Sequence, residues 1–367
     1  MHTLGTAVRS VHVIVPADVD DTAAPSGGNT YDRRVCAGLA RIGWSVNQIP
    51  VAGSWPQPDA AARVALARSL DTLPDGAVVL MDGLVVCGVP EVVVPEARRL
   101  RLVVLVHMPL ADEPGLVPAV AADFDARERA TLHAATAVVA TSPWAARRLV
   151  AHHGLAEERV YAAAPGTDPA PVAPGTDGAS HLLCVAAVTP GKGQDMLVEA
   201  LAAVADLPWS CVLVGALRRN PDYVGQVREL IERHSLGDRV RLVGPSAGDR
   251  LNALYAAADL LVLASRTETF GMVLTEALAR GIPVLTTAVG ALPDTLGRAP
   301  DGTVPGLLVP PGDVPALSAA LRRWFGDQDL RDTLRSAALH RRAAIGGWAA
   351  TSRTLAGVLD RLGGRSA

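Results

Sequence analysis

Short apolar runs alternate with amphipathic stretches along most of the chain. In the first half the runs cover residues 11–15, 77–81, 102–106 and 137–140, and in the second half 182–188, 211–214, 240–243, 260–263 and 283–286. Continuous Val- and Leu-rich runs separated by helices are typical of parallel sheets that are covered on both faces. The pattern therefore predicts an α/β protein with two doubly wound, Rossmann-like domains.

A Pro- and Gly-rich stretch with few charges, residues 165–179, separates the two halves. Such a composition favours an interdomain linker. We expect an N-terminal domain over 1–168, a linker over 169–180 and a second domain over 181–345. Two such domains predict a cleft that the carboxyl ends of both sheets face, which is where ligands bind in this fold class.

Composition narrows the classes of function. The chain has 367 residues, 49% of them hydrophobic, and a net charge of −3. Without a block of basic residues it is not expected to bind nucleic acid, and no apolar run reaches membrane-spanning length. The first ten residues lack the pattern of a signal peptide. The scattered cysteines, Cys36, Cys87, Cys184 and Cys211, predict buried reduced thiols in a cytoplasmic protein.

Lys192 is the only lysine of the chain, which uses Arg at every other such position. It follows the apolar run 182–188 and a Pro-Gly turn, and a helix is expected from about Asp195. The end of a strand leading into a helix is a favoured anion site, and a compact ammonium differs most from arginine at phosphates. A stray surface lysine is the alternative interpretation.

Two glutamates, Glu268 and Glu276, form the most specific pattern, with seven residues between them. The first lies in a loop after the run 260–263, and the second lies on a helix expected from Gly271 to Arg280. Helix capping and an exposed helix face are the simpler interpretations of each glutamate alone. The helix start would leave backbone amides free to bind oxygens, namely those of Phe270, Gly271, Met272 and Val273.

The first helix is expected to follow the loop of residues 25–29. Asn29 would cap this helix and Asp32 would face the positive end of its dipole. The glycines at 27 and 28 would let another group approach the backbone, although a tight turn explains them equally well.

Several polar residues are not expected to form a site. Asp18 and Asp20 resemble an Asp-x-Asp metal motif but lie among turn residues, which favours a solvated loop. His152 and His153 are adjacent, and neighbouring helix residues are not expected to face one metal. The sequence therefore predicts no metal site.

At this point the chain resembles the family-4 retaining glycosyltransferases of the GT-B fold, which use nucleotide sugars. The spacing of Glu268 and Glu276 resembles the family's Glu–seven residues–Glu motif. Further similar segments occur in the family's order along nearly the whole chain: residues 26–31, 106–109, 140–144, 164–168, 192–193, 214–215, 241–244 and 289–294. The stretch from Trp348 resembles the C-terminal helix that crosses back to the first domain, so that 346–367 is expected to form it.

The resemblance implies a role for each matching residue. Lys192 would neutralise the leaving diphosphate, Glu268 would hold the donor sugar, and His107 would contact the donor sugar or the acceptor near the reacting carbon. Glu276 would bind the ribose hydroxyls. The other donor-binding candidates are Gly28, Gly215, Leu242, Phe270, Gly271, Met272 and Val273, and the acceptor-binding candidates are Asn29 and Tyr31.

The resemblance also implies the partners. They are a nucleotide-diphosphate sugar, with UDP or GDP as the expected nucleotide, and a small hydroxyl acceptor, and no further cofactor is expected. The sequence does not favour membrane association, without excluding it, and it does not determine the oligomeric state.

One departure from the family pattern leaves alternatives open. Family members usually carry an arginine where this chain has Ala187, and Arg218, Arg219 or Arg266 would have to replace its charge. A GT-B relative without normal transfer, such as a pseudo-glycosyltransferase or an isomerase, and a non-catalytic sugar-nucleotide binding protein are the alternatives.

Overall fold

The computed structural model describes residues 9–21, 26–113 and 115–363. Most of the N-terminal segment that argued against a signal peptide, and Pro25 of the first-helix loop, lie outside the described residues. The chain divides into two compact units. One contains the chain up to Asp20, Gly27–Gly166 and the segment from Trp348, and the other contains Thr167–Gly347.

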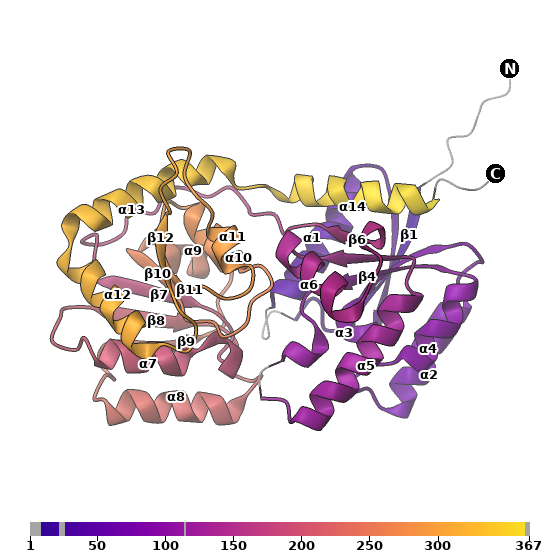
Figure 1. The fold of residues 1–367 in the computed structure, drawn as a ribbon, viewed down its shortest axis with the longest axis horizontal. Coiled ribbons are helices and arrows are strands. Elements are labelled where there is room, and N and C mark those ends of the chain that lie inside the picture. The colour runs from indigo at the N-terminus through magenta and orange to yellow at the C-terminus, as the bar shows by residue number, and fades with distance from the viewer. Residues whose placement is uncertain (1–8, 22–25, 114, 364–367) are drawn as a thin grey trace, which may run out of the picture. The chain divides into compact units, whose positions relative to one another are not determined.

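The N-terminal unit contains a six-stranded parallel sheet with the strand order β2-β1-β3-β4-β5-β6. Figure 1 draws the strands of this unit in indigo to magenta. The strands are β1 (Ser10–Pro16), β2 (Ser45–Val51), β3 (Val78–Asp82), β4 (Arg101–Val106), β5 (Ala137–Ala140) and β6 (Val160–Ala162). Sequential strands run outward in both directions from the β1/β3 pair. This pair is therefore the switch point of the sheet, and ligands of doubly wound folds bind at its carboxyl side.

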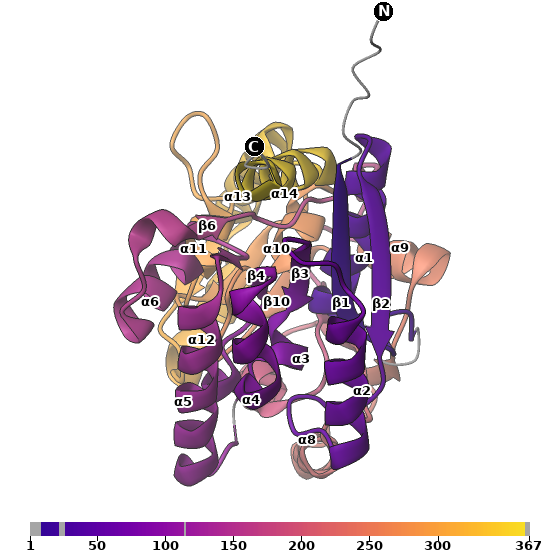
Figure 2. The ribbon, with the colours of Figure 1, turned by 90° about the vertical axis from the view of Figure 1, so that its right-hand side faces the viewer.

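Helices cover both faces of this sheet because side chains of each strand alternate between two hydrophobic clusters. In β4, Leu102 and Val104 face one cluster and Val103 and Leu105 the other. Figure 2 shows α2, α4 and α5 alongside the strands on the first side. This side has α2 (Ala60–Asp71), α3 (Gly83–Val86), α4 (Pro90–Val93), α5 (Pro118–Ala134) and α6 (Pro143–His153), and the other has α1 (Gly27–Arg41) and α14 (Trp348–Gly363).

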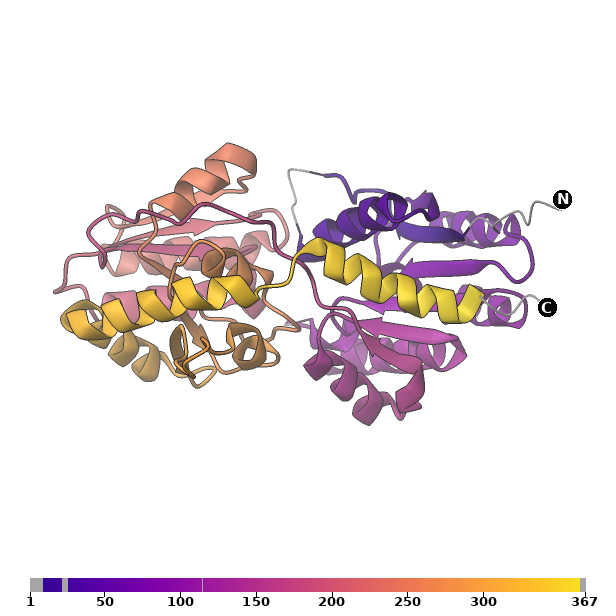
Figure 3. The ribbon, with the colours of Figure 1, turned by 90° about the horizontal axis from the view of Figure 1, so that it is seen from above.

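The last helix, α14, belongs to the N-terminal unit although the second unit precedes it in sequence. Figure 3 shows it in yellow, beside α1. Thr351 Oγ1 donates a hydrogen bond of 2.8 Å to Ala164 O, and the Trp348 ring lies edge-on to Tyr31 at 5.9 Å. The apolar side chains Leu355, Val358 and Leu359 then complete the cluster under α1.

The second unit repeats the architecture with the strand order β12-β11-β10-β7-β8-β9, again all parallel. The strands are β7 (His181–Val185), β8 (Ser210–Val214), β9 (Val240–Gly244), β10 (Leu260–Leu263), β11 (Val284–Thr287) and β12 (Gly306–Val309). The switch point lies between β7 and β10, so the loops after these two strands are the expected ligand site.

The faces of the second sheet are covered in the same way. One hydrophobic cluster lies under α7 (Gln194–Ala202), α8 (Pro221–Arg233) and α12 (Val314–Gly326), and the other under α9 (Gly248–Ala256), α10 (Met272–Leu278) and α11 (Leu292–Leu296). Helix α13 (Gln328–Arg341) contributes to both. The two doubly wound sheets predicted from the sequence are therefore present.

The Pro- and Gly-rich segment before β7 packs on the second unit. The amide of Ala173 donates to Arg280 O at 2.9 Å, and the Asp259 carboxylate accepts from the amides of Thr176 and His181 at 2.8 and 3.0 Å. A segment fixed by such bonds extends the second domain and is not a free tether. No helix among the described residues is both long and apolar enough to cross a membrane.

Candidate functional site at the switch points

The loop that carries Lys192 is pressed against the end of the neighbouring strand. After β7 the chain forms the short 3₁₀ turn Pro190–Lys192, and Gly193 follows with φ of 66°. A Cβ atom at Gly193 would lie 2.0 Å from Ala264 O, just after β10. Only glycine permits this backbone and this approach, and it holds Lys192 beside the loop after β10.

That second loop carries Glu268 and is tied to both sides. The Arg266 amide donates to Gly191 O at 2.8 Å, in the lysine loop. The Ala291 amide donates to Glu268 O at 3.1 Å, and Thr295 Oγ1 donates to Phe270 O at 2.6 Å. Backbone bonds in both directions therefore fix the position of Glu268 before any ligand is bound.

Lys192 and Glu268 meet at the switch point of the second sheet. Lys192 Nζ donates to Glu268 Oε2 at 2.6 Å, and both side chains are more than half buried. The lysine is thus not a stray surface residue. A cation and a carboxylate at the carboxyl end of two adjacent central strands can bind, between them, an anionic group and a hydroxyl-bearing group.

Glu276 lies on α10, after the loop that carries Glu268, and its carboxylate is held by a neighbouring side chain. Tyr255 Oη donates to Glu276 Oε2 at 2.7 Å. Burial raises the pKa of Glu276, the hydrogen bond from Tyr255 and the charge of Arg280 oppose this, and the charge of Asp168 adds to it. Its carboxylate is therefore oriented and poorly solvated, which suits an acceptor of hydroxyl hydrogen bonds.

The other donor-side candidates lie on or beside β8, β9 and the start of α10. The amide of Gly215, directly after β8, donates to Gly244 O at 3.0 Å, and Leu242 lies within β9. Helix α10 begins at Met272 with Gly271 at its N-cap, one residue later than predicted, so that Phe270 precedes it and Val273 follows in the first turn.

The structure places the three arginines that were expected to replace the charge of the arginine absent at position 187. Arg266 is engaged by Asp195, with Nη1–Oδ1 and Nη2–Oδ2 distances of 2.9 and 2.7 Å. Tyr223 Oη donates to the same carboxylate at 2.6 Å. Arg218 and Arg219 lie exposed after β8. Asp195 and Tyr223 were missed in the sequence because nothing in their local pattern marks a pairing with Arg266.

In the N-terminal unit, His107 lies directly after β4 and is held from three sides. Its Nε2 is 3.0 Å from Asp32 Oδ1, and the Tyr31 ring is edge-on at 5.3 Å. A Cβ atom at Gly28 would be 3.1 Å from Cδ2 of the imidazole, so a side chain there would have to displace the ring by a few tenths of an ångström. His107 and Gly28, predicted as site residues, are thus neighbours.

Two buried carboxylates accompany His107, and the sequence indicated neither as a site residue. Asp82 ends β3 and accepts from the Leu84 amide at 2.8 Å. Burial, the charge of Asp32 and a hydrogen bond with it raise the pKa of Asp82 to about 7, despite the charge of His107 and the Leu84 bond. Burial alone would lower the pKa of His107, but Asp32 and, less strongly, Asp82 raise it to about 9. At neutral pH the imidazole is therefore a cation.

The structure corrects three predictions for α1. Asn29 lies inside the first turn and is not its N-cap, because the helix begins at Gly27; its Nδ2 donates to Asp18 O at 3.3 Å. Tyr31 is buried, with Oη donating to Ala163 O at 2.9 Å, so it supports His107 and is not available to an acceptor. Asp32 lies beyond the first turn of α1 and contacts His107, so it does not interact with the positive end of the helix dipole as predicted.

The residues set aside in the sequence fall into two groups. Asp18 and Asp20 are exposed in the turn after β1, as expected for a solvated loop. The argument against His152 and His153 was wrong in its geometry: their rings are 4.7 Å apart at the end of α6. Among the described residues, Asp125 with these histidines, and Asp32 with Asp82 and His107, have metal-ligand spacing.

Comparison with solved structures defines the class of the fold. Over 98% of the chain and 100% of the other, it is similar to a sucrose-phosphate synthase from Thermosynechococcus elongatus, with a TM-score of 0.80 and 22% identity. Over 96% of the chain and 99% of the other, it is similar to Anabaena HepE, solved in complex with UDP-glucose, with a TM-score of 0.74 and 20% identity. The chain has the two-domain α/β fold of GT-B glycosyltransferases.

Sequence comparison adds a family match within the second unit. Residues 174–341 match the family described as glycosyl transferases group 1. A D-inositol 3-phosphate glycosyltransferase from Catenulispora acidiphila is 35% identical over 252 residues, which cover 63% of the chain and 59% of the relative. One from Kineococcus radiotolerans is 32% identical over 257 residues, 64% of the chain and 59% of the relative. The chain thus spans about three fifths of the length of the curated relatives it matches.

Proposed function

We propose that the chain is a glycosyltransferase that moves a sugar from a nucleotide-diphosphate sugar to a small hydroxyl acceptor with retention of anomeric configuration. The observation that supports this most directly is the Lys192–Glu268 pair, 2.6 Å apart at the switch point of a sheet within a group 1 glycosyltransferase domain.

Each donor-side residue has a proposed task that its environment supports. Lys192 neutralises the charge that develops on the leaving diphosphate, Glu268 holds the donor sugar, and Glu276, oriented by Tyr255, accepts from the ribose hydroxyls. Fixed charges in a poorly solvated site stabilise a leaving group more than water does, because they need no reorganisation.

The backbone amides from Phe270 to Val273 are proposed to contact the donor sugar with Glu268, and the backbone near Leu242 to face the base. We propose that the acceptor attacks the sugar on the face from which the diphosphate leaves, and that the diphosphate itself accepts the acceptor's proton.

On the N-terminal unit we propose that His107 contacts the donor sugar or the acceptor near the reacting carbon. As a cation held by Asp32, it can donate a hydrogen bond or stabilise negative charge, and it lies directly beside Gly28. It is not suited to act as a base at neutral pH, because its pKa is raised to about 9.

For the donor we propose UDP over GDP, since the solved structures with this fold include Anabaena HepE with UDP and with UDP-glucose. For the acceptor we propose a small polyol or its phosphate, since several relatives carry the name D-inositol 3-phosphate glycosyltransferase.

The proposal is tested by incubating the chain with UDP- and GDP-sugars, with and without inositol phosphates. We expect release of the nucleoside diphosphate that an acceptor accelerates, and a product whose anomeric configuration, measured by NMR, matches the donor. Excess chelator should leave turnover unchanged, because Lys192 replaces the metal. Tight binding of the donor without release would instead identify a binding protein, and inversion would refute the retaining mechanism.

A further inference from the structure

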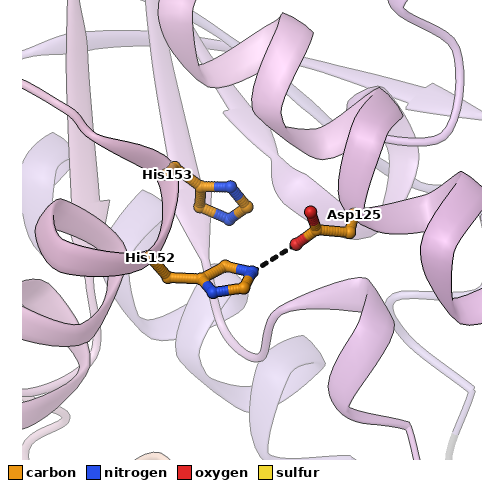
Figure 4. A group of neighbouring side chains, drawn as sticks. All are labelled: Asp125, His152 and His153. Carbon is orange, nitrogen blue, oxygen red and sulfur yellow. Dashed lines mark hydrogen bonds and ion pairs between the residues drawn. The ribbon is translucent and has the colours of Figure 1, made fainter.

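A second polar cluster lies in the N-terminal unit, away from the switch point. Asp125 is on α5, and His152 and His153 end α6 (Figure 4). Helix α6 starts directly after β5 and runs back against the strand direction. Its last turn therefore lies near the amino ends of the strands, whereas His107 lies at their carboxyl ends. The proposed transfer reaction does not use this cluster.

The three side chains converge on one region. Figure 4 shows the imidazole of His152 and the carboxylate of Asp125 paired through a hydrogen bond, with the imidazole of His153 next to them. One ligand atom from each of the three lies within 4.8 Å of the others. Ligands of a tetrahedral zinc ion lie about 3.3 Å apart, given bonds of about 2.0–2.2 Å, so a small inward movement would suffice.

The environment of His153 supplies an independent indication of a ligand. Its side chain is fully buried, and its Nε2 is 3.2 Å from Oε2 of Glu128, itself buried and bonded through Oε1 to the Leu110 amide. Its Nδ1 is buried and has no hydrogen-bond partner among the described residues. When a carboxylate accepts a hydrogen bond from one ring N–H, the lone pair of the neutral imidazole is on the other nitrogen. Metal-binding histidines usually have such a carboxylate or carbonyl partner on the nitrogen that does not bind the metal.

The neighbours of Asp125 hold its carboxylate in place. It accepts hydrogen bonds from His152 and from Arg129. Arg129 also binds the carbonyls of His152 and His153 at 3.1 and 3.2 Å, which fixes the end of α6. Its positive charge beside Asp125 weakens attraction for a cation, and the site must rely on its two imidazoles.

We propose that Asp125, His152 and His153 bind a zinc ion that joins α5 to α6. Two imidazole nitrogens and one carboxylate oxygen favour Zn²⁺ over Mg²⁺ or Ca²⁺, which prefer oxygen ligands alone. The ion takes the place of the hydrogen bond between His152 and Asp125, so that the imidazole nitrogen and the carboxylate oxygen both turn to the metal. His152 and Asp125 are partly exposed, so the ion can enter from solvent, and water completes its coordination.

The test uses the full chain without an affinity tag, after treatment with chelator. Isothermal calorimetry with Zn²⁺ should show one site per chain, and Zn²⁺ but not Mg²⁺ should raise the melting temperature. Glu128→Gln should weaken binding by about 10- to 100-fold, and His152→Ala or Asp125→Asn should weaken it more.

His234→Ala is the matched control, because His234 pairs with Glu199 at 2.9 Å in the second unit without belonging to a metal-spaced cluster among the described residues. It should leave Zn²⁺ affinity unchanged. Because His152 is about half exposed, its loss should not unfold the chain. An absence of Zn²⁺ binding to the wild type, or equal affinity in the His152, Asp125 and His234 variants, would overturn the proposal.

Discussion

At the scale of single residues, burial sets which groups carry charge in the N-terminal unit. Asp32, Asp82 and His107 come from three different elements, yet each shifts the protonation of another. The influence of these groups on one another's pKa can be measured, because a group whose pKa changes on folding makes the free energy of unfolding depend on pH.

We predict that His107 stabilises the N-terminal unit at low pH and that this contribution is lost in alkaline solution. The pKa of His107 is raised from 6.5 to about 9, so the folded state holds its proton more tightly than the unfolded state. Its contribution is fully present below about pH 6.5 and is lost as the pH rises through about 9, a change of up to about 3 kcal/mol. Urea unfolding of the wild type and of His107→Gln at both pH values measures it. Equal pH dependence in the two proteins would contradict the prediction.

Substituting the two glutamates one at a time should affect different properties, nucleotide binding for Glu276 and use of the sugar donor for Glu268. Glu276→Ala should weaken UDP binding by about 1.5–3 kcal/mol, the value of a hydrogen bond to a charged group. Glu268→Ala should leave UDP binding at least as strong, because Lys192 then has no competing carboxylate, while use of the complete donor is impaired. Calorimetry with UDP and turnover with the UDP-sugar distinguish these outcomes. The reverse pattern would mean that the two roles are exchanged.

The residue pattern predicted single positions better than it predicted their partners. Lys192 and Glu268 each stand out locally, yet their pairing joins positions 76 apart in sequence and depends on the adjacency of β7 and β10. Asp82 was missed because it follows an apolar run as an ordinary strand end. Tyr31 was assigned to the acceptor because its sequence position gives no sign that α14 and β6 bury its ring.

At the scale of elements, the central strands were predicted and three edge strands were not. The strands β2, β6 and β12 each lie at the edge of a sheet. Edge strands are less fully buried, so they need no continuous apolar run: β2 reads Ser-Val-Asn-Gln-Ile-Pro-Val, and β6 has only three residues. The hydrophobic pattern therefore detects all the central strands and one edge strand, β9, and misses the other three edge strands.

The loops after β7 and β8 carry a prediction about charge. A leaving diphosphate carries about two to three negative charges, and Lys192 with one helix N-terminus supplies about one and a half. Arg266 is already paired with Asp195. We therefore predict that Arg218 or Arg219 completes the site, so that its change to Ala slows transfer nearly as much as the loss of Lys192.

Ala187→Arg should partly rescue that variant, because it restores a cation on the same edge of the sheet. Steady-state turnover of the single and double variants measures both effects. If neither arginine matters and Ala187→Arg creates activity in a chain that had none, the native protein is better described as a sugar-nucleotide binder.

At the scale of the whole molecule, the chain uses one architecture twice. In each unit, side chains after the central strands gather where the strand order reverses: Asp32, Asp82 and His107 in the first, Lys192 and Glu268 in the second. The alternating pattern of runs and helices was sufficient to predict this architecture. The site's chemistry came from residue types that are unusual in this chain, above all its only lysine.

The central claim is that Lys192 stabilises the departing diphosphate and is not simply the partner of Glu268. Lys192→Met removes the charge with little change in volume, and a fixed donor at a leaving group contributes roughly 3–4 kcal/mol. The double variant Lys192→Met/Glu268→Gln removes the unpaired carboxylate and serves as the control for folding.

The decisive measurement is therefore the turnover of UDP-sugar by Lys192→Met, with its fold checked by circular dichroism and thermal unfolding. We predict a loss of about 10²- to 10³-fold in a folded protein, which the double variant does not restore even where it restores stability. Near-normal turnover in folded Lys192→Met, or recovery of turnover in the double variant, would show that the lysine only neutralises Glu268 and would contradict this mechanism.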